Sequence, residues 1–384
     1  MVEAAYIVSA VRTPVGRRGG GLSDVHPADL GALVLREVAN RAGVDPSHID
    51  DVIMGCVDQV GAQASNIART AVLSAEYPVH VPATTIDRQC GSSQQAVHFA
   101  AQAVASGTQN LVVAAGVEVM SLVPLGSATT AGRDAGLGEP RTGNQWRARF
   151  GSESFTQFAG AELIAAHWGI DRLEMEEFAY ASHSRAIAAI DSGAFDQEVV
   201  PCNGIVHDEG PRRDTSLERM QGLEPLRPGG TLTAGVSSQI SDGAAALLVA
   251  SGSAVERLGL QPLARIAAVD VVGSDPRFML SGPIPATRRV LDKAGLSLSD
   301  IGHFEVNEAF APVVLAWGKE LGADMDSTNP LGGAIALGHP LGATGARLMT
   351  TLVHAMRRNG TRWGLQTMCE GGGMANATIL ESVH

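Results

Sequence analysis

Short hydrophobic runs alternate with helical patterns along the first hundred residues. The apolar runs cover residues 5–11 (AYIVSAV), 50–57 (DDVIMGCV) and 110–117 (NLVVAAGV). Between the first two, residues 28–43 (ADLGALVLREVANRAG) repeat their apolar positions at helical spacing and end on Gly43, which is typical of a helix C-terminus. Runs of this length without regular polar alternation are typical of strands buried on both faces. The pattern predicts a layered α/β fold.

The last third of the chain repeats the pattern of the first third. Residues 41–56 (RAGVDPSHIDDVIMGC) resemble residues 293–308 (KAGLSLSDIGHFEVNE), and three pairs of like residues share one offset of 252 positions. The pairs are Gly43 and Gly295, Ile49 and Ile301, and Glu118 and Glu370. At this offset Cys90 corresponds to Gly342, so that both halves place an unusual turn before a helix. The repeat predicts a duplicated fold whose two turns meet at a pseudo-twofold interface.

A different kind of sequence separates the two halves. Residues 127–151 form a stretch rich in glycine and arginine, and an amphipathic helix follows, with Asp171 as the expected N-cap and Glu174 three residues later. We expect a lobe inserted between the halves, with loops over the site. The predicted division is residues 1–120 with 240–262 for the N-terminal half, 121–239 for the lobe, and 263–384 for the C-terminal half.

Composition narrows the class of protein. The chain has 384 residues, of which 18% are charged, and a net charge of −12, which argues against a general nucleic-acid binder. Four cysteines without metal-ligand spacing indicate free thiols in a reducing compartment and no metal site. The N-terminal residues lack the basic region of a signal peptide, and no apolar run is long enough to span a membrane. We expect a cytoplasmic enzyme.

Cys90 and Asn307 each follow an apolar run and precede a helical pattern. A thiol at a helix N-terminus faces unpaired backbone N–H groups, which can lower its pKa from about 8.5 to roughly 3.5–7.5. The alternative is a small buried residue at an element junction, the commoner role for a lone cysteine. Asn307 could present its amide to a ligand or water, or Asn307 or Glu308 could cap the following helix.

His339 lies among five glycines in residues 332–345 (GGAIALGHPLGATG). Neither phosphate-loop spacing is present, so we interpret the glycines as close packing around one imidazole, a candidate general base or a structural residue. Cys369, in residues 368–375 (MCEGGGMA), is a second thiol at a strand end. With Cys90 it suggests a site of two thiols, and a disulfide between them is disfavoured in a reducing compartment.

Four blocks in this order resemble the thiolase family, the 3-ketoacyl-CoA thiolases and acetyl-CoA acetyltransferases. They are DRQCGSSQQA, NEAFA, GGAIALGHPLGATG and MCEGGGMA, and the resemblance runs from VSAVRTPVG to CEGGGMANATILE. GTLTAGVSSQISDGAAALLVA also resembles the family's segment beside coenzyme A. The resemblance implies two similar halves in a layered αβαβα arrangement with an inserted loop lobe, which agrees with the 252-residue repeat.

The resemblance also implies a role for each motif residue. Cys90 would be the nucleophile that accepts the acyl group, and His339 would activate it and help stabilise an enolate oxygen. Asn307 would hold a water beside that oxygen, and Cys369 would be the acid and base for acetyl-CoA and CoA. The backbone N–H groups of Cys90 and Gly371 would form a second oxyanion hole. Ser238 would lie against the pantetheine of CoA.

The sequence departs from the usual family pattern near these residues. Asp87 replaces an asparagine, Gly91 replaces a serine, and Glu370 stands where an apolar residue is usual. In the lobe, FTQFAGAEL, with Gln157 and Phe158, resembles the degradative thiolases of actinobacterial steroid breakdown. We therefore expect a bulky or steroid-derived 3-ketoacyl-CoA substrate, with Ser238, Gln157 and Phe158 at the substrate.

Alternative functions stay open at this point. A biosynthetic acetoacetyl-CoA thiolase would use the same residues, and a non-catalytic acyl-CoA-binding subunit would share the fold. A Claisen or decarboxylating synthase is disfavoured by Cys369. The resemblance implies CoA and acetyl-CoA as substrate or product, no permanently bound cofactor, and a homodimer or homotetramer. Arg212, Arg213 and Arg219 lie in the lobe that would meet the CoA phosphates, although each could equally belong to a solvated basic face.

Overall fold

A computed structural model describes residues 3–153 and 155–383 and contains a mixed sheet of ten strands. The strands follow one another across the sheet in the order β4-β3-β5-β6-β1-β7-β10-β9-β8. The short strand β2 pairs only with β6 and is not part of this order. The strands are β1 (Ala5–Arg12), β2 (Gly16–Arg17), β3 (Asp51–Gly55), β4 (Ala83–Ile86), β5 (Leu111–Val119), β6 (Ser241–Ser251), β7 (Ala264–Gly273), β8 (His303–Val306), β9 (Trp363–Glu370) and β10 (Met374–Ser382). The three predicted strands are confirmed as β1, β3 and β5.

The sheet consists of two halves with the same strand order and directions. In the N-terminal half the order is β1, β6, β5, β3, with β4 added in parallel beyond β3, and in the C-terminal half it is β7, β10, β9, β8. In each half the first two pairings are antiparallel and the third is parallel. A short pairing of Tyr6 with Arg265 and of Ile7 with Ala264 joins the halves into one sheet. The predicted duplication is confirmed.

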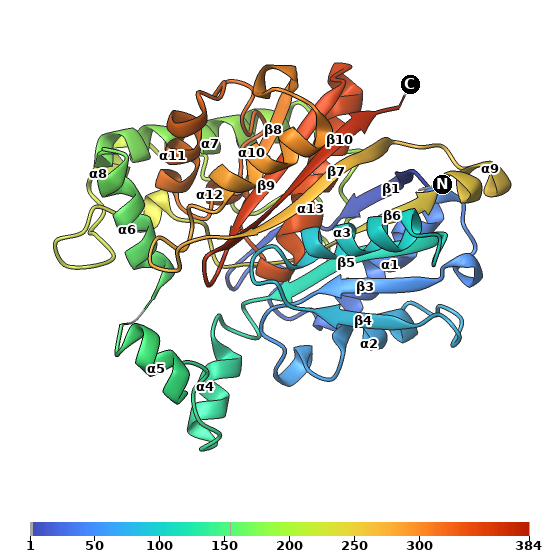
Figure 1. The fold of residues 1–384 in the computed structure, drawn as a ribbon, viewed down its shortest axis with the longest axis horizontal. Coiled ribbons are helices and arrows are strands. Elements are labelled where there is room, and N and C mark those ends of the chain that lie inside the picture. The colour runs from blue at the N-terminus through green and yellow to red at the C-terminus, as the bar shows by residue number, and fades with distance from the viewer. Residues whose placement is uncertain (1–2, 154, 384) are drawn as a thin grey trace.

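Helices form three layers around the two halves of the sheet (Figure 1). Helices α1 (Pro27–Ala42) and α2 (Ile67–Ser74) cover the outer face of the N-terminal half, and α10 (Pro283–Ala294) and α11 (Ala311–Leu321) cover the C-terminal half. Helices α3 (Ser92–Ala105) and α13 (Leu341–Asn359) lie between the halves and contact each other. Separate hydrophobic cores fill the spaces between layers. This is the expected αβαβα arrangement.

The local structure around the repeat also matches. Gly43 ends α1 with a φ of 63°, and Gly295 ends α10 with a φ of 66°, a left-handed conformation that glycine adopts without a steric cost. A 3₁₀ turn follows each glycine, at Pro46–His48 and Leu298–Asp300. Ile49 and Ile301 come next, and both are buried before the chain enters β3 or β8.

The segment between β5 and β6 is helical and irregular. It contains α4 (Ser127–Asp134), α5 (Asn144–Phe150), α6 (Gln157–His167), α7 (Arg172–Asp191) and α8 (Leu217–Gln221), and α4 and α5 project away from the layered body (Figure 1). Asp171 caps α7 as predicted, accepting a hydrogen bond from the Glu174 N–H at 2.9 Å. The remaining helices are α9 (Gly252–Leu258) and α12 (Ala334–Leu337). Within residues 3–153 and 155–383, no helix combines the length and apolarity that crossing a membrane requires.

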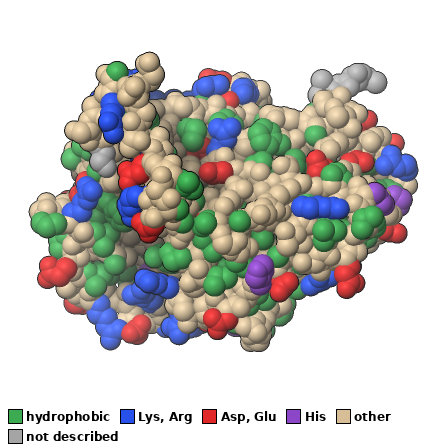
Figure 2. All heavy atoms as spheres, turned by 90° about the horizontal axis from the view of Figure 1, so that it is seen from below, with side chains coloured by type: hydrophobic (Ala, Val, Ile, Leu, Met, Phe, Trp, Pro, Cys, Tyr) green, Lys and Arg blue, Asp and Glu red, His purple; other side chains and the backbone are tan. Residues whose placement is uncertain are grey.

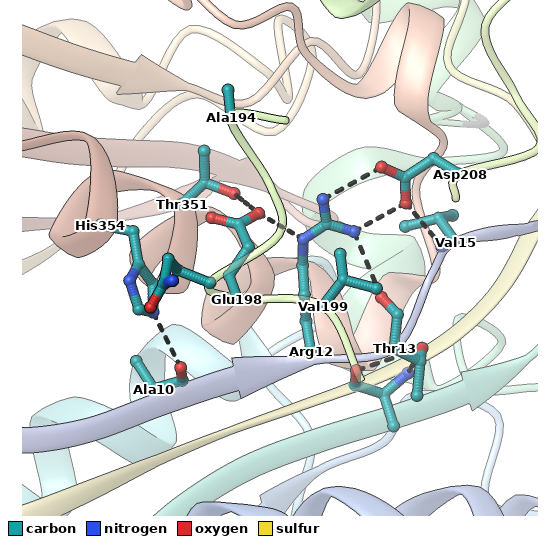
Figure 3. Close-up of polar contacts among 12 residues, drawn as sticks. Ala10, Arg12, Thr13, Val15, Ala194, Glu198, Val199, Asp208, Thr351 and His354 are labelled. Carbon is teal, nitrogen blue, oxygen red and sulfur yellow. Dashed lines mark hydrogen bonds and ion pairs between the residues drawn. The ribbon is translucent and has the colours of Figure 1, made fainter. Parts of the chain in front are cut away.

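A buried ion cluster ties this segment to the layered body (Figure 3). Arg12, at the end of β1, donates from Nε to Glu198 Oε1 at 2.5 Å and from Nη1 to Asp208 Oδ1 at 2.7 Å. Thr351 of α13 donates to the same Glu198 oxygen at 2.9 Å. Burial alone would lower the pKa of Arg12, but Asp208 and Glu198 outweigh it and raise that pKa. The cluster therefore fixes the lobe against both β1 and α13.

Candidate active site

A tight turn presents Cys90 between β4 and α3. Gln89 adopts a φ of 50°, and Asp87 Oδ1 accepts a hydrogen bond from its backbone N–H at 2.6 Å. Ser92 Oγ accepts from the Arg88 N–H at 2.9 Å and donates to the Gln89 carbonyl at 2.6 Å. These bonds stabilise the left-handed residue directly before Cys90. The unusual Asp87 therefore holds the turn.

The thiol of Cys90 has a raised pKa, contrary to the expected effect of a helix start. Burial raises the pKa of Cys90 to about 12, and the charge of Glu370 adds to the increase. The backbone N–H groups of Cys90 and Gly371 oppose this, because both stabilise the thiolate. Both N–H groups therefore act on the sulfur, and their role as an oxyanion hole stays a prediction. The resting site nevertheless holds a protonated thiol at neutral pH.

Cys369 and Gly371 lie directly beside this turn. Cys369 is the second-last residue of β9 and is buried, and its pKa is raised by burial and by the charge of Cys90. The chain then turns back into β10 through Gly372 and Gly373, which have φ values of 87° and 80°. A Cβ on Gly371 would lie 2.8 Å from Gln89 Oε1, so the glycine permits this close approach. The structure thus brings the two predicted thiols together.

His339 lies in the turn between α12 and α13 and is buried. Its Nδ1 lies 2.6 Å from Thr344 Oγ1, and that hydroxyl donates its proton to the Pro340 carbonyl at 2.8 Å. Nδ1 must therefore carry the ring proton, which leaves Nε2 with a lone pair as the acceptor nitrogen. Burial, together with the charge of Arg347, lowers the pKa of His339 to about 3. The imidazole is neutral and able to accept a proton at Nε2.

Asn307 follows β8 directly, and its Nδ2 lies 3.4 Å from His339 Nε2. Its backbone N–H donates to the Thr367 carbonyl at 3.1 Å, two residues before Cys369 on β9. The capping alternative for Asn307 and Glu308 is wrong, because α11 begins at Ala311 with Phe310 as its N-cap.

Glu308 is an unexpected link to the histidine loop. Its buried carboxyl accepts hydrogen bonds from Ser182 Oγ at 2.7 Å, Asn329 Nδ2 at 2.9 Å and the Ile335 N–H at 3.1 Å. Burial raises the pKa of Glu308, although these three donors lower it. The carboxyl joins α7 to the loop that carries His339. In the sequence, only its position directly after Asn307 indicated that Glu308 could belong to the site.

Close contact between α3 and α13 relates the cysteine turn to the histidine turn. Ser93 Oγ, in the first turn of α3, accepts a hydrogen bond from the Ala346 N–H at 2.8 Å. A Cβ on Gly345 would lie only 2.3 Å from the backbone nitrogen of Gln94, so the glycine lets the helices approach. Cys90 and His339 each lie two residues before one of these helices. The two helices that follow the matching turns therefore contact each other, as the predicted interface between the halves requires.

A groove of about 1220 Å³ leads away from Gln89 and Gly371. Gln157 and Phe158 line it, as do aromatic and arginine side chains of the lobe, including Trp146, Phe155, Arg141 and Arg147. Phe158 also packs edge-on against Phe310, with ring centroids 5.5 Å apart. Figure 2 views the molecule from below, where α4 and α5 project, and shows hydrophobic and charged side chains around a hollow at the left.

A second pocket, of about 240 Å³, lies in the lobe. Its walls include His183, Arg212, Arg219, Gly235 and Gln239. Burial, with the charge of Arg212, lowers the pKa of His183 to about 4, and His183 Nδ1 accepts from the Arg212 N–H at 3.1 Å.

Two other residues expected near CoA lie at the edge of this region. Arg213 pairs with Asp191 on the exposed surface, which fits the alternative of a solvated basic face. Ser238 is half-buried, and its backbone N–H donates to the Ala309 carbonyl at 3.0 Å. That bond places Ser238 between the approach to β6 and the Asn307 loop.

All four cysteines are free, and no three His, Cys, Asp or Glu side chains among the described residues gather in a way that could hold a metal ion.

Comparison with known proteins identifies the fold and the family. The thiolase N-terminal domain model matches residues 5–253, and the thiolase C-terminal domain model matches residues 260–382. The chain is 55% identical to the steroid 3-ketoacyl-CoA thiolase FadA6 of Mycobacterium tuberculosis, over 99% of this chain and 95% of that protein. It is 44% identical to a β-ketoadipyl-CoA thiolase of Escherichia coli, with all of both chains covered.

Solved structures agree with this assignment. Human mitochondrial 3-ketoacyl-CoA thiolase in complex with CoA superposes with a TM-score of 0.90 at 37% identity, covering 100% of this chain and 98% of that one. The acetyl-CoA acetyltransferase of Bacillus anthracis superposes with a TM-score of 0.89 at 38% identity, covering 100% and 99%. The two matching domain models together span almost the whole chain. The chain belongs to the thiolase family of acyltransferases.

Proposed function

We propose that this protein is a 3-ketoacyl-CoA thiolase, an acetyl-CoA C-acyltransferase that cleaves 3-ketoacyl-CoA with CoA through an acyl-cysteine. The observation that carries the proposal is the pair of neighbouring thiols, Cys90 and Cys369, with the N–H groups of Cys90 and Gly371 stabilising charge at the Cys90 sulfur. Cleaving a C–C bond beside a ketone needs a soft nucleophile and donors for the developing oxyanion.

The first half-reaction forms the acyl-enzyme. The thiol of Cys90 and the imidazole of His339 are both neutral at rest. His339 Nε2 therefore accepts the Cys90 proton at the same time as the sulfur attacks the 3-keto carbon. The N–H groups of Cys90 and Gly371 stabilise the resulting oxyanion, at about 3–4 kcal/mol for an effective donor. The C2–C3 bond then breaks, and Cys369 protonates the acetyl-CoA carbanion. Protonated His339, with a water held by Asn307, stabilises the enolate oxygen.

The second half-reaction transfers the acyl group to CoA. The Cys369 thiolate takes the proton of the incoming CoA thiol, whose sulfur attacks the acyl-Cys90 thioester. The same two backbone N–H groups stabilise the new oxyanion. Its collapse releases acyl-CoA, and the Cys90 sulfur recovers its proton from His339. All protons are returned, so the site is ready for another cycle.

The lobe supplies the substrate sites in this proposal. The pocket lined by His183, Arg212 and Arg219 would bind the anionic part of CoA mainly through Arg212, because Asp214 also lines this pocket and pairs with Arg219. Ser238 lies where the pantetheine would enter toward Asn307. The proposed division is residues 1–120 with 240–262 for the half that carries Cys90, 121–239 for CoA and acyl binding, and 263–384 for the half that carries His339 and Cys369.

The groove supports a bulky acyl group. Its volume of about 1220 Å³ exceeds what an acetyl group needs, and Gln157 and Phe158 line it. The Mycobacterium tuberculosis relative is named for a steroid substrate. We propose a degradative enzyme whose 3-ketoacyl-CoA substrate is bulky or steroid-derived. CoA and acetyl-CoA are substrate and product, no cofactor is resident, and the enzyme is a cytoplasmic homodimer or homotetramer.

A thiolysis panel tests the activity and its substrate together. The loss of Mg-enolate absorbance is followed for acetoacetyl-CoA, a long linear 3-ketoacyl-CoA and a ring-derived one, with Cys90→Ala as the control. We expect the highest kcat/KM for the ring-derived substrate and no turnover by the variant. Preference for acetoacetyl-CoA would instead favour a biosynthetic acetoacetyl-CoA thiolase; the Bacillus anthracis neighbour is named an acetyl-CoA acetyltransferase. Absence of turnover on all three would favour a non-catalytic acyl-CoA-binding subunit.

A further inference from the structure

Two glutamates at equivalent positions of the repeat have very different surroundings. Glu118 on β5 and Glu370 on β9 are both buried, and each reaches the start of a helix of the central layer. Glu118 reaches α13 and accepts hydrogen bonds from the N–H groups of Val57 (2.9 Å), Asp58 (3.2 Å) and Gly342 (2.9 Å) and from Gln63 Nε2 (2.7 Å). The carboxyl of the N-terminal half is therefore fully paired and has a structural role.

Glu370 reaches the corresponding place at the start of α3, against Gly91. A Cβ on Gly91 would lie 2.0 Å from Glu370 Oε1, so the carboxyl occupies the space that a side chain at position 91 would need. Within the described residues, neither Glu370 oxygen has a hydrogen-bond partner. Asn376 Nδ2, which is also close, donates instead to the Gly91 carbonyl at 3.1 Å. A buried carboxyl without donors costs stability, so structure alone does not account for it.

The groups around Glu370 come from three elements. The turn before α3 contributes Asp87, Arg88 and Cys90, β9 contributes Cys369, and β10 contributes only uncharged side chains. Burial raises the pKa of Glu370, the charge of Arg88 lowers it and the charge of Asp87 raises it, and together these effects bring the pKa to about 8. In return, a charge on Glu370 raises the pKa of both Cys90 and Cys369. Loss of the proton from Glu370 therefore makes loss of the proton from Cys90 less favourable, and the reverse also holds.

We propose that Glu370 is a positioning residue whose protonation controls the reactivity of Cys90, with Gly91 making room for it. The neutral carboxyl leaves the Cys90 thiolate unopposed, and the ionised carboxylate destabilises it. The only chemical step is the exchange of one proton between the Glu370 carboxyl and solvent. The inference rests on the proposed function in that it takes Cys90 as the nucleophile.

The direction of the pH effect follows from these neighbours. Below about pH 8 Glu370 is neutral, and the Cys90 thiolate fraction rises tenfold for each pH unit. As the pH passes through this region, Glu370 ionises and raises the pKa of Cys90, so that the thiolate fraction rises less steeply. The glutamine of Glu370→Gln has the shape of glutamate but does not titrate. It should remove this bend from the pH profile of Cys90 and leave the profile below about pH 8 unchanged.

The test measures the reactivity of the thiol directly. Alkylation of Cys90 by iodoacetamide is followed by peptide mass spectrometry from pH 6 to pH 10 in the wild type, in Glu370→Gln and in Glu381→Gln. Glu381 lies at the far end of β10 and pairs with Arg265, so it serves as a matched control. Cys202 of the lobe is the internal reference, because its pKa is raised by burial alone.

We expect the wild-type rate at Cys90 to bend near pH 8 and the Glu370→Gln rate to rise without a bend. At pH 9 the variant reacts about three- to tenfold faster than the wild type, and at pH 6.5 the two rates agree. Glu381→Gln follows the wild type. Parallel profiles for the wild type and Glu370→Gln would overturn the proposal.

Two further measurements keep the outcome unambiguous. If Glu370→Gln does not fold, as judged by circular dichroism, the wild-type profile decides, and a straight line through pH 8 overturns the proposal. Wild-type thiolysis is assayed in parallel. A bend in the alkylation profile without thiolysis would refute the proposed function and leave the control of Cys90 by Glu370 intact.

Discussion

At the residue scale, the hydrogen bonds of His339 determine which of its nitrogens can act as a base. Thr344 Oγ1 donates to the Pro340 carbonyl and is therefore an acceptor for the proton on His339 Nδ1. This leaves Nε2 unprotonated, on the side where Asn307 lies. The low pKa of His339, about 3, keeps the ring neutral at every pH above that value. In the proposed mechanism, proton transfer from Cys90 to His339 therefore accompanies attack on the substrate, because the raised pKa of Cys90 and the lowered pKa of His339 favour the neutral pair at rest.

Thr344→Val removes the acceptor that fixes this tautomer. We expect kcat to fall about 100-fold, the lower end of what a general base contributes, with KM little changed. Thr350→Val is the matched control, since Thr350 is buried on the same helix and its hydroxyl has no hydrogen-bond partner among the described residues. Steady-state thiolysis of both variants is the measurement. Equal activity of the two variants would show that Thr344 does not orient His339.

At the element scale, the contact between α3 and α13 sets the spacing of the site. Gly345 and Gln94 touch because glycine has no side chain, and Gln94 is held in turn by Gln366 and Thr378. The side chains of Gln94 and Gln95 therefore contribute to the packing of α3, since both are buried. They do not line the groove that leads away from Gln89 and Gly371.

Gly345→Ala places a methyl group 2.3 Å from the Gln94 backbone nitrogen, so the two helices must separate. We expect a loss of about 100-fold in kcat/KM, because a displacement of about 1 Å at a catalytic site has an effect of that size. Gly132→Ala in α4 is the control. Nothing lies within 4 Å of the added methyl there, and the substitution should stabilise the protein by about 0.5–1 kcal/mol. Wild-type activity of Gly345→Ala would mean that the spacing tolerates the change.

The sequence predicted the elements better than it predicted their electrostatics. Local apolar runs and Gly43 were enough for β1, α1, β3 and β5, because strand burial and helix ends depend on neighbouring residues. The pKa of Cys90 could not be predicted in this way. It depends on burial between layers and on Glu370, which lies 280 positions away. The helix start alone indicated a lowered pKa, whereas the folded surroundings raise it.

At the scale of the whole molecule, the buried cluster of Arg12 joins parts that are distant in sequence. Glu198 and Asp208 lie 186 and 196 positions from Arg12, and Thr351 of α13 bonds the same Glu198 (Figure 3). No local pattern marked these partners, although the 252-residue repeat did predict the duplicated sheet. The cluster positions the proposed substrate lobe relative to the helix that follows His339.

Arg12→Met tests this anchor. The substitution leaves two buried carboxylates without their cation, and we expect the free energy of unfolding to fall by about 3–5 kcal/mol. Arg265→Met is the control, because its partly exposed pair with Glu381 contributes about 0–1 kcal/mol. Urea denaturation of both variants is the measurement. A loss below about 1 kcal/mol for Arg12→Met would show that the lobe is held by other contacts.

The central claim is that Cys90 carries the acyl group between two half-reactions. Its most direct test is mass spectrometry of the protein after brief incubation with a 3-ketoacyl-CoA in the absence of free CoA. We predict one added acyl group, on the peptide that contains Cys90, which disappears when CoA is supplied and is absent from Cys90→Ala. An adduct on Cys369, or thiolysis by Cys90→Ala at the wild-type rate, would contradict the account.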